Sequence, residues 1–153
     1  MFVTETLSLF SLLAAAVLLV WIAAGDARAL TIKNRDVALL LLAALAFLGF
    51  AQPGDLLARV LMAAVLFAVT FLFWLKGALG AGDVKLFGAV GLLIPTGAAM
   101  GFALALAGIA VGLVALVRLG ASRGGLAGLA ARGRVPFGVP IAGATLAVLP
   151  FNL

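Results

Sequence analysis

The sequence contains no cysteine, no histidine and no tyrosine, and only five of its 153 residues are acidic. The absence of cysteine excludes disulfides, thiolate nucleophiles and cysteine-based metal sites. The absence of histidine removes the side chain that serves most often as a general base and as a metal ligand. Any catalysis by this chain must therefore use Asp, Glu, Lys, Ser or Thr.

Charge is also scarce, at 10% of residues, whereas 67% of residues are hydrophobic and the mean hydropathy is +1.38. A soluble domain carries about 25% charged residues, so this composition indicates an integral membrane protein. We interpret residues 1–153 as a single all-α, polytopic membrane domain. The apolar blocks between charges predict six transmembrane helices, over residues 6–25, 37–52, 56–75, 83–95, 98–117 and 136–152.

The fourth block is short for a crossing. Either its turn lies later than Pro95, or its helix begins below the membrane surface. Two GxxxG patterns, Gly97 to Gly101 and Gly108 to Gly112, follow in the next block. We assign them to packing within the chain in preference to a dimer face, and the sequence sets no oligomeric state.

Nine of the ten basic residues fall in three connections, 25–36, 76–85 and 118–134, that share one side of the membrane. The positive-inside rule places these connections in the cytoplasm and both termini outside. Arg59 falls on the other side, where we expect its side chain to snorkel to the surface. The net charge of +5 is explained by this topology and by contact with anionic lipid, so no nucleic-acid partner is expected.

Three of the five acids favour structural roles. Glu5 is expected to be an exposed charge before the first span, and Asp36 and Asp55 are expected to be N-caps of the second and third spans.

The other two acids, Asp26 and Asp83, lie at helix ends on the predicted cytoplasmic side. An ion pair with Arg28 would explain Asp26, and an N-cap after a flexible loop would explain Asp83. Taken together, two carboxylates in one site split their pKa values, which creates an acid and a base from one residue type. Such a pair needs neither a metal nor a cofactor.

Three segments resemble the type IV prepilin peptidases in the right order. They are Gly25–Asn34 around the first Asp, Gly80–Leu86 with its GxGD motif followed by Lys, and Arg134–Pro140 with Pro-Phe-Gly. The resemblance implies a membrane aspartic endopeptidase with Asp26 and Asp83 as its catalytic residues. It also implies that Gly80, Gly82, Lys85 and Asn34 bind substrate or position the loop, with the two glycines letting Asp83 approach Asp26.

The implied substrate is a prepilin, whose basic leader is cleaved at the cytoplasmic face of the bacterial inner membrane, just before an apolar helix. Lys33 stands where the family usually has Pro, and the N-terminal insertion with paired Cys motifs is absent. The chain therefore resembles the short, tight-adherence (Flp-type) form, for which no methyltransferase activity is expected.

Three alternatives remain open. One is a presenilin-like protease, which the lack of Tyr and of a Pro-Ala-Leu pattern disfavours. Another is a small transporter, which would favour ionisable groups near the bilayer midplane. The third is a non-catalytic subunit of a pilus or secretion assembly system.

Overall fold

The computed structural model describes residues 2–119 and 135–153, and these contain six α-helices and no strand. Each predicted segment corresponds to one helix, but only 56–75 has the predicted bounds. The helices are α1 (Phe2–Ala29), α2 (Asn34–Ala51), α3 (Leu56–Leu75), α4 (Ala81–Gly91), α5 (Ala99–Leu119) and α7 (Gly138–Val148), with two short 3-10 helices, η1 (Thr96–Ala98) and η2 (Leu149–Asn152). The all-helical fold is thus confirmed. The third basic connection, 118–134, was predicted to lie in the cytoplasm, and nearly all of it lies outside the described residues.

Four of these helices, α1, α2, α3 and the η1–α5 segment, are long and apolar enough to cross a membrane. By contrast, α4 and α7 have only 11 residues each. The fourth segment ends at Gly91, earlier than Pro95, so the suggestion of a later turn is wrong. Six crossings and the orientation of the termini stay predictions.

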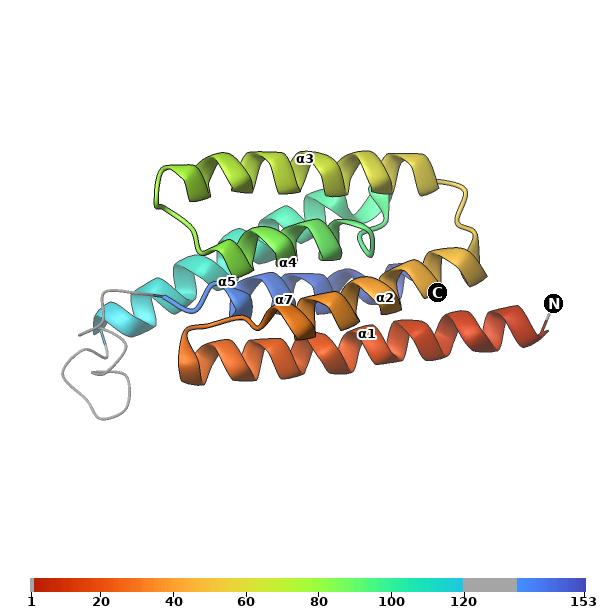
Figure 1. Cartoon of the computed structure of the whole chain (residues 1–153), viewed down its shortest axis with the longest axis horizontal. Helices are drawn as coiled ribbons and strands as arrows, with labels where there is room; N and C mark the ends of the chain where they lie inside the picture. Colours follow the sequence, from red (N-terminus) through yellow and green to blue (C-terminus); the bar gives the residue numbers. More distant parts are fainter. Residues whose placement is uncertain (1, 120–134) are drawn as a thin grey trace.

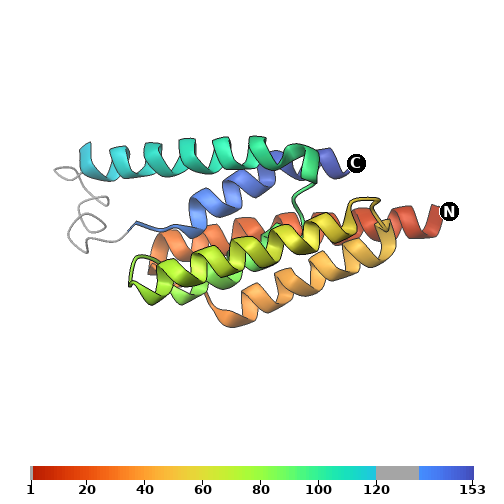
Figure 2. The same cartoon turned by 90° about the horizontal axis from the view of Figure 1, so that it is seen from above.

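The long helices surround the two short ones. Most of α7 is buried, with Ile141, Ala144 and Thr145 at 0% exposure, and it contacts α1, α4 and α5. Figure 2 shows α7 in blue lying between α5 and α1. The long helices turn large apolar side chains such as Trp21, Leu57 and Leu104 outward, as lipid-facing helices do.

The helical connections gather at two opposite ends of the bundle (Figure 1). The α1–α2 and α3–α4 connections, the last turn of α5 and the start of α7 meet at one end, which we call the Asp26 end. The α2–α3 connection, the turn before η1 and the C-terminus meet at the other, which we call the Asp55 end. This arrangement places Asp26 and Asp83 at one end of the fold.

Close helix packing uses glycines other than the predicted ones. A Cβ added at Gly91 would lie 2.5 Å from Ala63 Cα, so α3 and α4 approach each other with almost no space between backbones. In contrast, a Cβ at Gly108 or Gly112 would meet nothing within 4 Å. The assignment of that GxxxG pattern to packing within the chain is therefore wrong for the described residues. Hydropathy does not show which face of a uniformly apolar helix is covered.

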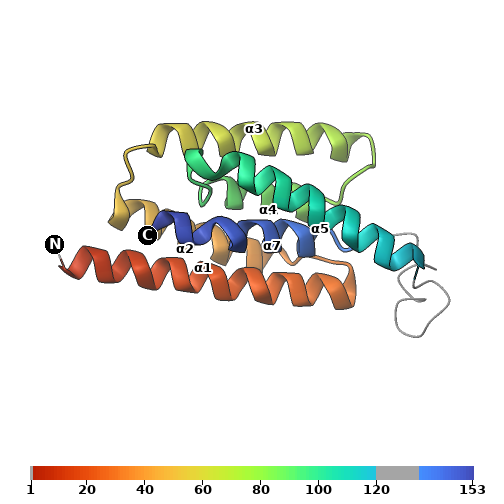
Figure 3. The same ribbon diagram turned by 180° about the vertical axis from the view of Figure 1, so that it is seen from behind.

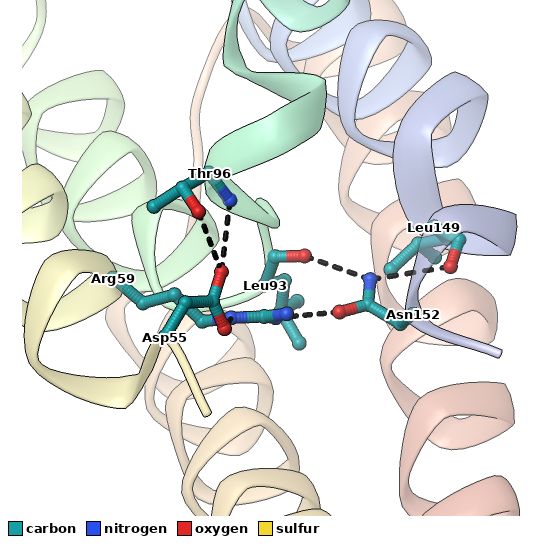
Figure 4. Close-up of polar contacts among 6 residues, drawn as sticks. All are labelled: Asp55, Arg59, Leu93, Thr96, Leu149 and Asn152. Atoms are coloured by element: carbon teal, nitrogen blue, oxygen red, sulfur yellow. Dashed lines mark hydrogen bonds and ion pairs between the residues drawn. The ribbon is translucent and has the colours of Figure 1, made fainter. Parts of the chain in front are cut away.

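A cluster of polar contacts surrounds Arg59 at the Asp55 end (Figure 4). Arg59 is only 4% exposed, which corrects the expected snorkelling, and its Nε donates to Asp55 Oδ1 at 2.7 Å. Its guanidinium also donates to Asn152 Oδ1 in η2, and Asn152 Nδ2 donates to the Leu93 carbonyl at 3.0 Å. The cluster therefore ties the C-terminus to α3 and to the turn after α4.

Asp55 occupies the predicted N-cap position of α3, but its side chain makes no cap hydrogen bond. Its Oδ2 instead accepts bonds from the backbone N–H and the hydroxyl of Thr96, at 2.9 and 3.0 Å. Asp36 is not an N-cap, because α2 begins at Asn34 after Lys33 and Asp36 is the third helical residue. A carboxylate there still benefits from the positive end of the helix dipole.

Candidate active site

Asp26 is a buried carboxylate near the end of α1. The helix continues to Ala29 and closes with Leu30 in the left-handed region (φ 52°), whose N–H donates to the Asp26 carbonyl at 2.8 Å. The side chain is only 4% exposed, and its Oδ2 accepts the backbone N–H of Gly138 at 2.8 Å. Among the described residues the ion pair with Arg28 does not form, so the local-pair explanation of Asp26 is wrong.

Gly138 belongs to the Pro-Phe-Gly motif, but the sequence predicted no role for it. A Cβ at this position would lie 2.9 Å from Asp26 Oδ2 and 3.0 Å from Asp26 Cβ. Only glycine therefore lets the start of α7 come this close to the carboxylate. The signal in the sequence was the glycine directly after Pro136 and Phe137, at the start of an apolar segment.

Asp83 lies in the first turn of α4, at the same end of the bundle. It is the third helical residue, not the N-cap, and its Oδ2 accepts the backbone N–H of the N-cap Gly80 at 3.1 Å. A Cβ at Gly82 would lie 2.8 Å from Ile32 Cβ, so this glycine lets α4 pack against the α1–α2 connection. The GxGD motif thus has two separate geometric uses, one for each glycine.

The two carboxylates influence each other electrostatically. Asp83 lies outside the four long helices, and its pKa is raised to about 6. Burial is the main cause of this rise, the Gly80 N–H opposes it, and the negative charge of Asp26 raises the pKa further. Asp26 and Asp83 thus lie at the same end of the bundle, where the charge of Asp26 acts on the pKa of Asp83.

The remaining predicted site residues form a contact of their own. Lys85 Nζ donates to Asn34 Oδ1 at 2.8 Å, which links the first turns of α4 and α2. Both residues are exposed, and within the described part of the chain no hydrogen bond or ion pair joins them to Asp26 or Asp83. This geometry suits a pair that positions the loop before α4.

The comparisons with known proteins were made on the whole chain. The model of the type IV leader peptidase family matches residues 13–117, which hold both Asp26 and Asp83. The chain belongs to the type IV leader peptidase family. No curated protein and no solved structure matched it.

Membership of this family makes the chain a peptidase, and its apolar helices make it a multi-pass membrane protein. The family match ends before α7, yet Gly138 at the start of α7 is the residue that holds Asp26. Among the residues that the structure describes, no group of three acidic side chains is placed to hold a metal ion.

Proposed function

We propose that this leader peptidase is an aspartic endopeptidase that removes the basic leader of type IV, Flp-like prepilins at the cytoplasmic face of the inner membrane. The observation that carries the proposal is the convergence of two carboxylates, from helices 57 residues apart in sequence, on one end of the fold. Each of them accepts a backbone N–H, Asp26 from Gly138 and Asp83 from Gly80.

The proposed reaction assigns a role to each carboxylate. One carboxylate of the pair, in its ionised form, takes a proton from a water molecule, which attacks the peptide carbonyl carbon. The other, protonated, donates a hydrogen bond and then its proton to the carbonyl oxygen. Collapse of the tetrahedral intermediate returns a proton to the leaving nitrogen and frees a carboxylic acid and an amine. Burial raises the pKa of Asp83 to about 6, which makes its protonated state accessible near neutral pH.

Charge at the same end supports the predicted orientation. The basic residues at the Asp26 end lie in its connections or in the helical turns that border them: Arg28, Lys33, Arg35, Lys76 and Lys85. Basic residues of this kind are retained on the cytoplasmic side of a membrane. A leader removed at this face would be cut before it leaves the cytoplasm.

The test is cleavage of a full-length single-span prepilin by the purified chain in lipid nanodiscs, with the products identified by mass spectrometry. Asp26→Asn and Asp83→Asn are each expected to lower the cleavage rate at least about 1,000-fold, because each removes one half of the acid–base pair. Asp36→Asn and Glu5→Gln are matched controls that keep most activity.

Normal cleavage by either folded active-site variant would refute the assignment of the pair. Absence of cleavage by the native chain, together with its stable association with pilus-assembly proteins, would favour the non-catalytic alternative.

A further inference from the structure

An apolar groove of about 460 Å³ runs between α3 and α5. Met62, Leu66 and Phe73 line its α3 side, and an alanine-rich face of α5 that includes Ala103 and Ala107 lines the other. Figure 3 shows these two helices crossing the same face of the bundle. Since α3 packs closely on α4, and α5 packs on α7, the groove separates two helical pairs.

The groove offers no polar group that needs a partner. Its one polar side chain, Thr70, has its hydroxyl bonded back to the carbonyl of Leu66 at 2.6 Å. An occupant must therefore be apolar along its length. The small side chains of α5 would allow the backbone of an occupying helix to approach closely.

One end of the groove reaches the candidate active site. Two of its lining residues, Leu79 and Phe137, directly precede Gly80 and Gly138, the glycines whose N–H groups bind the two carboxylates. A third, Phe87, lies one helical turn from Asp83 on the same face of α4. A chain that followed the groove would arrive at the carboxylate pair.

We infer that this groove is the docking surface for the apolar helix of the substrate, which enters between α3 and α5 from the lipid and presents its N-terminal peptide bond to Asp26 and Asp83. The inference rests on the proposed function, in which the scissile bond directly precedes such a helix. From Ala99 to Ala110 the lining spans eleven residues of rise, or about 16 Å, which accommodates three turns of a helix.

Continuity with the two carboxylates distinguishes this groove from a larger cavity on α1 and α2. That cavity, of about 670 Å³, is lined by α1, the α1–α2 connection and the start of α2, and its charged lining residues are Arg28, Lys33 and Asp36. Its two cations outnumber its one carboxylate, so its net charge would repel a basic leader. The α3–α5 groove has no charged lining residue.

The first test fills the groove. Ala107→Phe is expected to raise KM for a full-length prepilin about tenfold or more, with cleavage of a short leader peptide that lacks the apolar helix unchanged. Ala68→Phe is the matched control, since Ala68 is also an exposed alanine on a spanning helix but does not line the groove. An equal KM for the helix-bearing substrate in both variants would overturn the inference and leave the proposed function intact.

The second test needs no cleavage. The chain has no cysteine, so Ala107→Cys introduces a single thiol that can be oxidised to a disulfide with a single cysteine placed in the substrate helix. In an Asp83→Asn background, the cross-link is expected at Ala107→Cys and not at Ala68→Cys. A cross-link without any cleavage by the native chain would support the groove while refuting the proposed reaction. Equal cross-linking at both positions, as for contact through the lipid alone, would refute the groove.

Discussion

Asp55 and Asp83 lie at opposite ends of the α3–α4 hairpin and differ in what surrounds their carboxylates. Burial raises the pKa of Asp55, but the Thr96 N–H, Arg59 and the Thr96 hydroxyl outweigh it and bring that pKa to about 2. Asp83 has one backbone donor and a neighbouring carboxylate, and its pKa is about 6. The surroundings of Asp55 stabilise its charged form, whereas those of Asp83 favour protonation.

The difference between the two ends lies in how many donors and opposite charges surround each carboxylate. At the Asp55 end, Asp55 and Arg59 form an ion pair, and the carboxylate accepts bonds from three donors on Thr96 and Arg59. At the Asp26 end, the negative charge of Asp26 raises the pKa of Asp83. Each carboxylate accepts a backbone N–H, Asp83 from Gly80 and Asp26 from Gly138. Satisfied ion pairs stabilise a fold, whereas perturbed carboxylates are typical of active sites.

The largest effect is expected from breaking the Asp55 cluster. Asp55→Asn would leave the guanidinium of Arg59 buried without an anion, which we expect to lower the free energy of unfolding by about 3 kcal/mol. The measurement is denaturant unfolding in mixed micelles, followed by tryptophan fluorescence. Glu5→Gln, at an exposed acid, is the control, and equal stability of the two variants would show that the cluster is not stabilising.

At the Asp26 end the corresponding change acts on catalysis. Gly138→Ala puts a Cβ against Asp26 and is expected to reduce the cleavage rate about 10- to 100-fold, because the carboxylate must shift from its N–H donor. Gly108→Ala is the control, since an added Cβ there meets nothing within 4 Å. Undiminished cleavage by Gly138→Ala would show that this contact does not position Asp26.

A smaller effect of opposite sign is expected at Asp83. Because the folded state raises the pKa of this group from 3.8 to about 6, ionisation at neutral pH opposes folding. Asp83→Asn should therefore increase the free energy of unfolding at pH 7, by on the order of 1 kcal/mol. The gain should shrink as the pH falls from about 6 and vanish below about 4, where Asp83 is protonated in both states.

Unfolding curves of the native chain and of Asp83→Asn across this pH range check the sign. A gain that stays constant with pH would exclude the ionisation of Asp83 as its cause.

The smallest effect is expected from the exposed contact between Lys85 and Asn34. Lys85→Met should lower the free energy of unfolding by less than about 1 kcal/mol, because water can replace the lost partner. Cleavage assays against the full-length substrate should change by only a few-fold. A loss as large as that of Asp83→Asn would instead assign Lys85 to the chemistry.

The sequence predicted the helical fold and the ends at which Asp26 and Asp83 lie, because charges are costly in lipid and interrupt apolar runs. It failed where the outcome depended on contacts between distant residues. Arg59 was expected at the surface, but its partner Asn152 lies 93 residues further along the chain. The spacing of Asp55 and Arg59, which are four residues apart, is typical of an ion pair along a helix. It could have predicted this pair but not the contact with Asn152.

Similarly, the role of Gly138 depends on how α7 packs against α1, which no local pattern specifies. The sequence of a uniformly apolar helix such as α5 does not show which of its faces packs against other helices. The pattern at Gly108 was therefore predicted to pack within the chain, whereas a Cβ there meets nothing within 4 Å.

The segment from Gly138 to Asn152 is hydrogen-bonded at both of its ends, to Asp26 at one and to Arg59 at the other. Its length, about 24 Å from the rise of its two helices, is that of a rod across most of a hydrocarbon core. Its two anchoring contacts lie at opposite ends of the bundle. A shift of the Arg59 cluster would therefore be passed along α7 to the Gly138 N–H that Asp26 accepts.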